Sequence, residues 1–194
     1  MNTSTKLTVS RLAAAPIYLL SFLFLGTAGK WVCLALLWWA AFSDVMDGKI
    51  ARKRGEISDL GKFLDPIADS TFFVTVFFCF TWVGLMPLWM LLLIVIRESF
   101  QNAFLRPYCN ARGIVVAAKK IGKAKTVTQS IVSQIIVTTL GLHPFILGSI
   151  SQKTWEIWTG SVCYALLGGV TLLSVTSLYP YVMTLKQLPA AGNR

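Results

Sequence analysis

Four aspartates between residues 44 and 69 occur at helical spacings. Asp44 and Asp47 are three residues apart, and Asp65 and Asp69 are four apart, so on helices each pair projects from one face. The short connection between the two segments predicts antiparallel neighbours, which brings the four carboxylates together. Carboxylate oxygens without nearby His or Cys favour hard divalent cations such as Mg²⁺, Mn²⁺ or Ca²⁺. The spacing therefore predicts a site for divalent cations.

The residues that follow the first pair are suited to a diphosphate. Gly48 lies one turn after Asp44, where the missing side chain lets a phosphate or a ribose approach the helix backbone. One turn further, Ala51 leaves space and Arg52 supplies a guanidinium that can hold phosphate oxygens. Two metal ions bridged by shared carboxylates stabilise the attacking and leaving oxygens of phosphoryl transfer. The pattern thus predicts phosphoryl transfer on a metal-bound diphosphate.

Helices that cross a membrane must position these residues. Of the 194 residues, 55% are apolar and 13% are charged, and the mean hydropathy is +0.66, whereas a soluble domain carries about 25% charged residues. A membrane-spanning helix needs about 20 mostly apolar residues. The chain is therefore expected to form one all-α integral membrane domain, residues 1–194, with six transmembrane helices near residues 12–28, 31–50, 63–83, 87–105, 127–147 and 155–185.

The basic residues predict the orientation of these helices. The chain has 18 Lys and Arg against 8 Asp and Glu. With six spans, 15 of the basic residues lie on the side of the two termini and of the loops near residues 49–62 and 106–125, whereas Lys30 and Lys153 lie opposite and Arg97 lies within a span. The positive-inside rule places both termini and the carboxylates on the cytoplasmic side. No segment has the Arg-rich, Ser-rich character of a transit peptide, so we expect a multi-pass protein of a bacterial plasma or inner membrane.

A longer pattern surrounds the four aspartates. It consists of Asp44, Asp47, Gly48, Ala51, Arg52, Gly61, Asp65 and Asp69. These residues resemble the signature of the CDP-alcohol phosphatidyltransferase family at all eight specified positions. The resemblance implies a six-helix membrane enzyme in which an acceptor alcohol displaces CMP from CDP-diacylglycerol or a related CDP-linked donor. It also implies a homodimer among membrane lipids, with no nucleic-acid partner.

The resemblance assigns a role to each residue of the pattern. Two metal ions, Mg²⁺ or Mn²⁺, would be held by Asp44, Asp47, Asp65 and Asp69. Asp69 would also be the general base that removes the proton of the acceptor hydroxyl, a choice among the four carboxylates that spacing alone does not make. The cytidine diphosphate pocket would be lined by Gly48, Ala51, Arg52 and Gly61.

The prediction of the acceptor depends on the second cytoplasmic loop and the residues around it. Segments 97–98, 105–106 and 122–126, with Gln129, resemble the branch of the family that uses glycerol 3-phosphate and forms phosphatidylglycerophosphate and CMP, as does segment 8–11. A phosphate-bearing acceptor needs cationic partners. The candidates are Arg97, Arg106, Arg112, Lys123 and Lys125.

Arg97 and Glu98 are neighbours within a predicted span. Adjacent residues of a helix point in different directions, so these two are not expected to pair.

The chain departs from the family pattern at two places. Ser and Thr occupy positions 4–5, where the family commonly has Pro and Asn, and Ser70 stands where Lys is common. Inositol phosphate and serine are therefore alternative acceptors.

A different class of function uses the same residues. Intramembrane carboxylates that face the interior of a bundle serve ion transport as readily as catalysis. A divalent-cation transporter also needs polar groups that continue to the far side of the membrane. The predicted extracellular halves are apolar, with few hydroxyl groups, so the pattern favours the transferase.

Overall fold

The computed structural model describes residues 3–54, 59–111, 119–146, 151–181 and 183. These residues form helices without any strand, which confirms the all-α prediction. The helices are α1 (Thr3–Phe24), α2 (Gly26–Arg54), α3 (Asp59–Trp82), α4 (Leu88–Phe100), α5 (Arg106–Ala111), α6 (Lys119–Ile146), α7 (Gln152–Ile157) and α8 (Tyr164–Thr176). Two π-helical segments, η1 (Gln101–Leu105) and η2 (Trp158–Cys163), join α4 to α5 and α7 to α8, so each of these pairs forms one rod.

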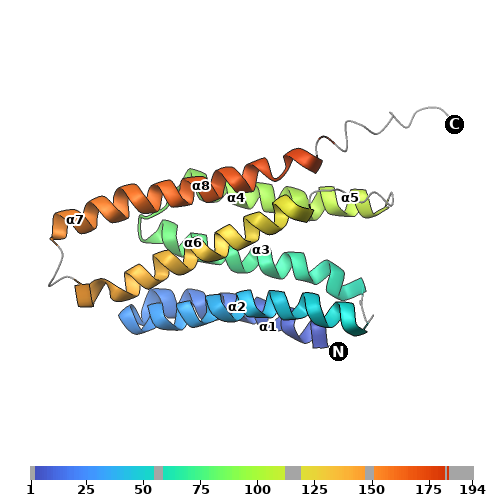
Figure 1. Cartoon of the computed structure of the whole chain (residues 1–194), viewed down its shortest axis with the longest axis horizontal. Coiled ribbons are helices and arrows are strands. Elements are labelled where there is room, and N and C mark those ends of the chain that lie inside the picture. The colour runs from blue at the N-terminus through green and yellow to red at the C-terminus, as the bar shows by residue number, and fades with distance from the viewer. Residues whose placement is uncertain (1–2, 55–58, 112–118, 147–150, 182, 184–194) are drawn as a thin grey trace.

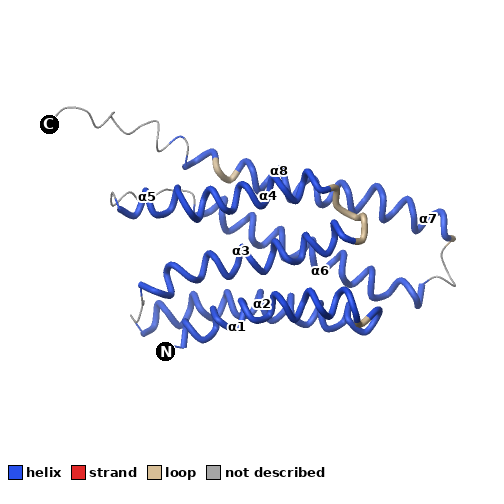
Figure 2. The backbone as a smooth tube through the Cα atoms, turned by 180° about the vertical axis from the view of Figure 1, so that it is seen from behind, coloured by secondary structure: helices blue, strands red, loops and turns tan. Residues whose placement is uncertain are grey.

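The six rods lie lengthwise in one elongated bundle (Figure 1). Each rod packs against the next in the order α1, α2, α6, α8, α4, α3 and back to α1, which closes the bundle into a ring. The start of α1, the end of α2, the start of α3 and helix α5 lie at one end of the bundle, and the view from behind agrees (Figure 2). Segments that are far apart in the sequence therefore meet at that end.

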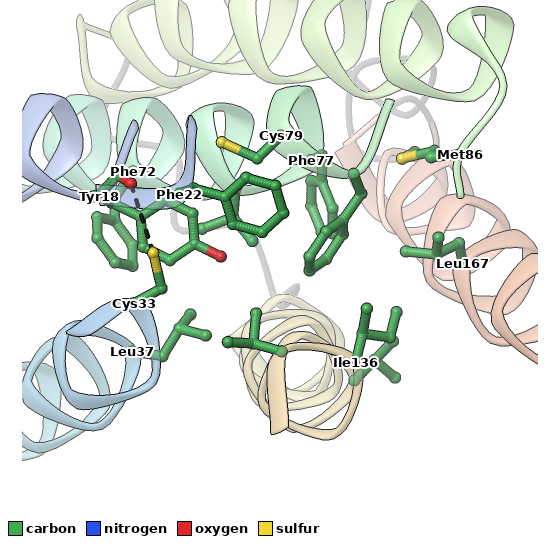
Figure 3. Close-up of a cluster of buried hydrophobic side chains, with 14 of the residues drawn as sticks. Tyr18, Phe22, Cys33, Leu37, Phe72, Phe77, Cys79, Met86, Ile136 and Leu167 are labelled. Carbon is green, nitrogen blue, oxygen red and sulfur yellow. Dashed lines mark hydrogen bonds between the residues drawn. The ribbon is translucent and has the colours of Figure 1, made fainter. Parts of the chain in front are cut away.

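Aromatic and aliphatic side chains fill the centre of the ring (Figure 3). Tyr18 of α1 and Phe72 of α3 are fully buried and meet edge to face with 5.8 Å between ring centroids, and Phe77 continues this cluster along α3. The thiol of Cys33 donates to the carbonyl of Tyr18 at 3.4 Å. Buried aromatic pairs of this kind contribute about 0.5–1.5 kcal/mol beyond the area they bury, so the core ties α3 to the first helical hairpin.

The outer surface of the bundle carries many large apolar side chains. Phe24, Trp82 and Phe145 expose 77%, 69% and 72% of their surfaces, an arrangement that fits a lipid environment and not water. Within the part of the chain that the structure describes, three segments are long and apolar enough to cross a membrane: Leu88–Cys109, Ala124–Ile146 and Lys153–Tyr181. Thr8–Phe24 is a shorter apolar helix. The structure is thus that of a helical membrane protein.

The turn between α1 and α2 depends on two glycines and one lysine. Gly26 has a φ of 54°, which ends α1 in a conformation that suits glycine. The ammonium of Lys30 then donates to the carbonyl oxygen of Phe22 at 2.7 Å and lies 3.3 Å from the centre of the Phe22 ring. Gly29 allows this return, because a Cβ there would lie 1.9 Å from the carbonyl oxygen of Ser21.

Candidate active site

Two of the predicted carboxylates lie at the contact between α3 and α1. Asp65 and Asp69 are one turn apart on α3 and face Thr8 and Arg11, which are three residues apart on α1. The guanidinium of Arg11 forms an ion pair with Asp69 through Nη1 and approaches Oδ1 of Asp65 to 3.5 Å through Nη2. The hydroxyl of Thr8 donates to Asp65. Helix α1 therefore takes a direct part in the site.

The burial of this cluster leaves one side of it accessible. The side chain of Arg11 is 3% exposed, whereas those of Asp65 and Asp69 are 35% and 34% exposed. Carboxylate oxygens are the donors that Mg²⁺ and Mn²⁺ prefer. A pair of partly exposed carboxylates one helical turn apart therefore fits a hard divalent cation.

The other residues predicted to bind metal or donor belong to the same end of the bundle. Backbone positions Asp44, Asp47, Gly48, Ala51 and Arg52 belong to the C-terminal half of α2, and Gly61 to the start of α3. Their side chains lie outside the described part of the structure. Among the side chains that are described, no three His, Cys, Asp or Glu form a group. Figure 1 shows the end of α2 and the start of α3 beside the first turns of α1.

A cavity of about 270 Å³ adjoins Asp69 and Arg11. Helices α2 and α3 supply apolar and aromatic walls to it, and α6 supplies a polar row at four-residue spacing. The row consists of Thr126, Ser130 and Gln134. A carboxylate and a guanidinium next to such a mixed lining suit a molecule that has both a polar and an apolar part.

A second polar cluster surrounds Glu98 on α4. The carboxylate of Glu98 accepts hydrogen bonds from Arg97 at 2.8 Å and from Ser70 at 2.9 Å, and it forms an ion pair with Lys125 of α6. The prediction that Arg97 and Glu98 do not pair is wrong. Both residues are more than nine-tenths buried, and an isolated buried charge is so costly that the long, flexible Arg97 side chain turns back to its neighbour.

The predicted acceptor-binding cations fall into two groups. Arg97 and Lys125 are buried against Glu98, and Arg97 also donates to the hydroxyl of Ser177 that follows α8. Arg106 begins α5 and is half-buried. Lys123 belongs to α6, but its side chain lies outside the described residues, as does all of Arg112. Two cations on one carboxylate leave a net positive charge in the bundle.

A family model described as CDP-alcohol phosphatidyltransferase matches residues 1–178 of this chain. The chain belongs to the CDP-alcohol phosphatidyltransferase family. It is therefore an enzyme, and this family is the one that the eight-residue pattern predicts. The match begins before α1 and ends after α8, so it includes the whole ring of helices.

Three bacterial proteins with curated names are similar to this chain, two of them over most of its length. A CDP-diacylglycerol–glycerol-3-phosphate 3-phosphatidyltransferase of Bacillus subtilis is 32% identical over 182 residues, which cover 87% of this chain and 91% of the relative. A protein of the same name from Cereibacter sphaeroides is 34% identical over 162 residues, or 80% and 72% of the two chains. A cardiolipin synthase (CMP-forming) of Streptomyces coelicolor is 36% identical over 96 residues, or 48% and 45%.

Several residues of this candidate site are not predicted from the sequence. In the sequence, Thr8 and Arg11 stand out only by charge or family likeness, and Ser70 only as a departure from the family pattern. Asn102 of η1, whose amide donates to the hydroxyl of Ser70 at 2.8 Å, belongs to no motif in the sequence. One usable signal was present, because Thr8 and Arg11 are polar residues at helical spacing beside an apolar stretch, like the aspartates that they contact.

Proposed function

We propose that this membrane enzyme transfers a phosphatidyl group from CDP-diacylglycerol to glycerol 3-phosphate, which gives phosphatidylglycerophosphate and CMP. The observation that carries the proposal is the carboxylate pair Asp65 and Asp69, which Thr8 and Arg11 hold beside a cavity of mixed polarity. Two relatives that are named for this reaction align over 72% and 91% of their own lengths. These long alignments favour glycerol 3-phosphate over inositol phosphate or serine.

In this proposal Asp69 accepts the proton of the acceptor hydroxyl. The acceptor oxygen attacks the β-phosphorus of the donor, the bond from that phosphorus to the oxygen of CMP breaks, and CMP leaves with the electron pair. Asp69 borders the cavity and keeps a third of its surface exposed, so it can meet a hydroxyl there. Arg11 fixes the orientation of the Asp69 carboxylate by holding it from the buried side.

The same carboxylates would hold the metal. Two Mg²⁺ or Mn²⁺ ions would be bound by Asp44, Asp47, Asp65 and Asp69. When bound, such ions supply positive charge that stabilises the diphosphate and the departing CMP. Gly48, Ala51, Arg52 and Gly61 would form the cytidine diphosphate pocket. The phosphate group of the acceptor would be attracted by Arg106, Arg112 and Lys123. The cluster around Arg97 and Lys125, which carries a net positive charge, would attract it too.

The proposal includes the arrangement in the membrane. The chain would form one domain, residues 1–194, with six membrane-spanning rods, both termini in the cytoplasm and the site at the cytoplasmic side of a bacterial plasma membrane. The start of α1, the end of α8 and the carboxylate region lie at one end of the bundle, which supports this orientation (Figure 1). The concentration of basic residues in the predicted cytoplasmic segments of the sequence supports it too. A homodimer is part of the same proposal.

Release of CMP by the purified protein tests the function. The enzyme in detergent would receive Mg²⁺ and CDP-diacylglycerol with glycerol 3-phosphate, inositol phosphate or serine in separate reactions. Phosphatidylglycerol would be a fourth acceptor, because one relative is a cardiolipin synthase. We expect release with glycerol 3-phosphate. Release with another acceptor alone would replace the substrate assignment, and metal flux into proteoliposomes without any CMP release would indicate a transporter.

A further inference from the structure

Asp65 and Asp69 of α3 are each followed by a residue that the α4 rod contacts. Pro66 follows Asp65, and its carbonyl oxygen lies 3.5 Å from the amide nitrogen of Asn102. Ser70 follows Asp69, and its hydroxyl accepts a hydrogen bond from the same amide at 2.8 Å. The Ser70 hydroxyl also donates to Glu98 at 2.9 Å. Its hydrogen and one lone pair are thus both used by the α4 rod.

The two residues that hold Ser70 are themselves fixed. Oε1 of Glu98 receives Arg97 and Lys125, while Oε2 of the same carboxylate receives Ser70. The carboxylate is therefore held by two cations from two helices. Asn102 lies four residues after Glu98, in the π-helical segment η1, so the two side chains reach α3 from one face of the rod. π-helical turns are rare in proteins, and those that occur are frequently found at functional sites.

A hollow lies beside Ser70 between this part of α3 and the α4 rod. It has a volume of about 550 Å³ and is bordered by Val74, Val95 and Ala103 as well as by Ser70, Glu98 and Asn102. Apolar packing across the hollow cannot fix the turn. Pro66 weakens the turn further, because it lacks the amide hydrogen that would bond the preceding turn of the helix.

We propose that Glu98 and Asn102 are positioning residues that clamp α3 through Ser70 and thereby set the placement of Asp65 and Asp69. Thr8 and Arg11 hold the carboxylates from α1, and the clamp holds the backbone that bears them from the opposite neighbour in the ring. The inference rests on the proposed function in one respect, which is that Asp65 and Asp69 bind the metal and Asp69 is the base.

Ser70→Ala tests the clamp, because it removes the hydroxyl that both α4 residues contact. Binding of Mn²⁺ to the full-length protein in detergent would be followed by electron paramagnetic resonance, without substrate. We expect the dissociation constant for Mn²⁺ to rise about 10-fold, in line with the effect of residues that orient metal ligands. We expect kcat to fall by a similar factor, and KM for both substrates to change less than about twofold.

Matched variants separate positioning from a general loss of stability. Thr75→Val removes a hydroxyl that borders the same hollow but bonds only its own helix, at the carbonyl of Thr71, and it should behave as the wild type. Ser70→Thr keeps the hydroxyl, so its Mn²⁺ affinity and kcat should stay near the wild-type values that Ser70→Ala loses. Asn102→Leu removes the clamp from the other side and should reproduce Ser70→Ala, and it carries the test if Ser70→Ala does not fold.

The outcomes distinguish the clamp from the proposed reaction. Wild-type Mn²⁺ affinity and kcat in Ser70→Ala and Asn102→Leu would overturn the clamp while CMP release by the wild type still supports the reaction. A wild type that binds Mn²⁺, loses that affinity in Ser70→Ala and releases no CMP would support the clamp and overturn the reaction. A wild type that binds no Mn²⁺ would overturn both.

Discussion

The guanidinium of Arg11 lies between two carboxylates, and its planar fork is the feature that lets one cation meet both. Nη1 contacts Asp69 and Nη2 approaches Asp65, from a side chain that is almost fully buried. The side chains of Asp65 and Asp69 remain 35% and 34% exposed. Arg11 therefore orients the acidic pair without closing access to it.

Replacement of Arg11 by lysine should separate charge from geometry. Arg11→Lys keeps the positive charge, but a single ammonium cannot present two nitrogens to two carboxylates. We expect kcat to fall about 10-fold with the protein still folded, as for other residues that orient a site. The measurement is CMP release with a melting curve on the same sample. Lys153→Gln, which changes an exposed charge on α7, is the control, and an unchanged kcat in Arg11→Lys would show that charge alone suffices.

Replacement of Asp69 by asparagine tests the assigned base. The amide has nearly the same shape but cannot accept the hydroxyl proton. Asp69→Asn should lower kcat by at least about 100-fold, the lower limit of typical general-base effects, while the binding of CDP-diacylglycerol changes little. Single-turnover CMP release and equilibrium binding of the donor measure the two effects. Normal turnover in this variant would assign the base to another group.

At this scale the sequence predicted which residue types could do the chemistry but not their partners. Spacing placed Asp65 and Asp69 on one helix face, because a helical period needs only local information. The contacts of Arg11 join residues 54 and 58 positions apart, and no periodic pattern encodes such a distance. The rule that adjacent side chains diverge failed for Arg97 and Glu98 because it ignores the length of the arginine side chain and the cost of burying its charge unpaired.

The helices extend beyond the apolar stretches from which they were predicted. Helix α1 begins at Thr3 and α2 continues to Arg54, past the hydrophobic limits near residues 12 and 50. Hydropathy indicates the part of a helix that suits lipid, whereas backbone hydrogen bonding continues into the polar flanks. The π-helical segments η1 and η2 were not predicted, because a single wide turn leaves no hydrophobic period of its own.

The turn between α1 and α2 gives a prediction for a single element. Gly29→Ala would place a Cβ 1.9 Å from the backbone oxygen of Ser21, which cannot move without breaking the end of α1. We expect a loss of about 2–3 kcal/mol, the upper part of the range for overpacked sites, seen as a lower melting temperature in detergent. Gly169→Ala is the control, because a Cβ there meets no atom within 4 Å. Equal stability of the two variants would contradict this account.

On the scale of the whole molecule, the ring of helices places α1 between α2 and α3 in the order of contacts. The first helix therefore touches both segments that carry aspartates. Hydropathy and the positive-inside rule predicted the elements and an orientation for them, but the ring order depends on which apolar faces fit together. Those fits are made by particular shapes, such as Tyr18 against Phe72, and composition does not specify them.

Cysteine labelling tests the orientation of the molecule. The four native cysteines are buried, so reaction with a membrane-impermeant maleimide should have a low background. Lys153→Cys, at an exposed position of α7, should react in intact cells because the proposed topology places it outside. Asn193→Cys should react only after the membrane is opened. The reverse pattern would invert the proposed topology and place the site on the outer face.

The contact between Arg97 and Glu98 also bears on how the chain enters the membrane during synthesis. When α4 enters the membrane, α6 and α8 have not yet been inserted, so Lys125 and Ser177 are not available. A lone charge at the centre of a nascent helix costs about 2.5–3.5 kcal/mol on the insertion scale. Because Arg97 and Glu98 meet at 2.8 Å within the same helix, they can pass through the translocon as a neutral unit. Lys125 then joins a carboxylate that is already in place.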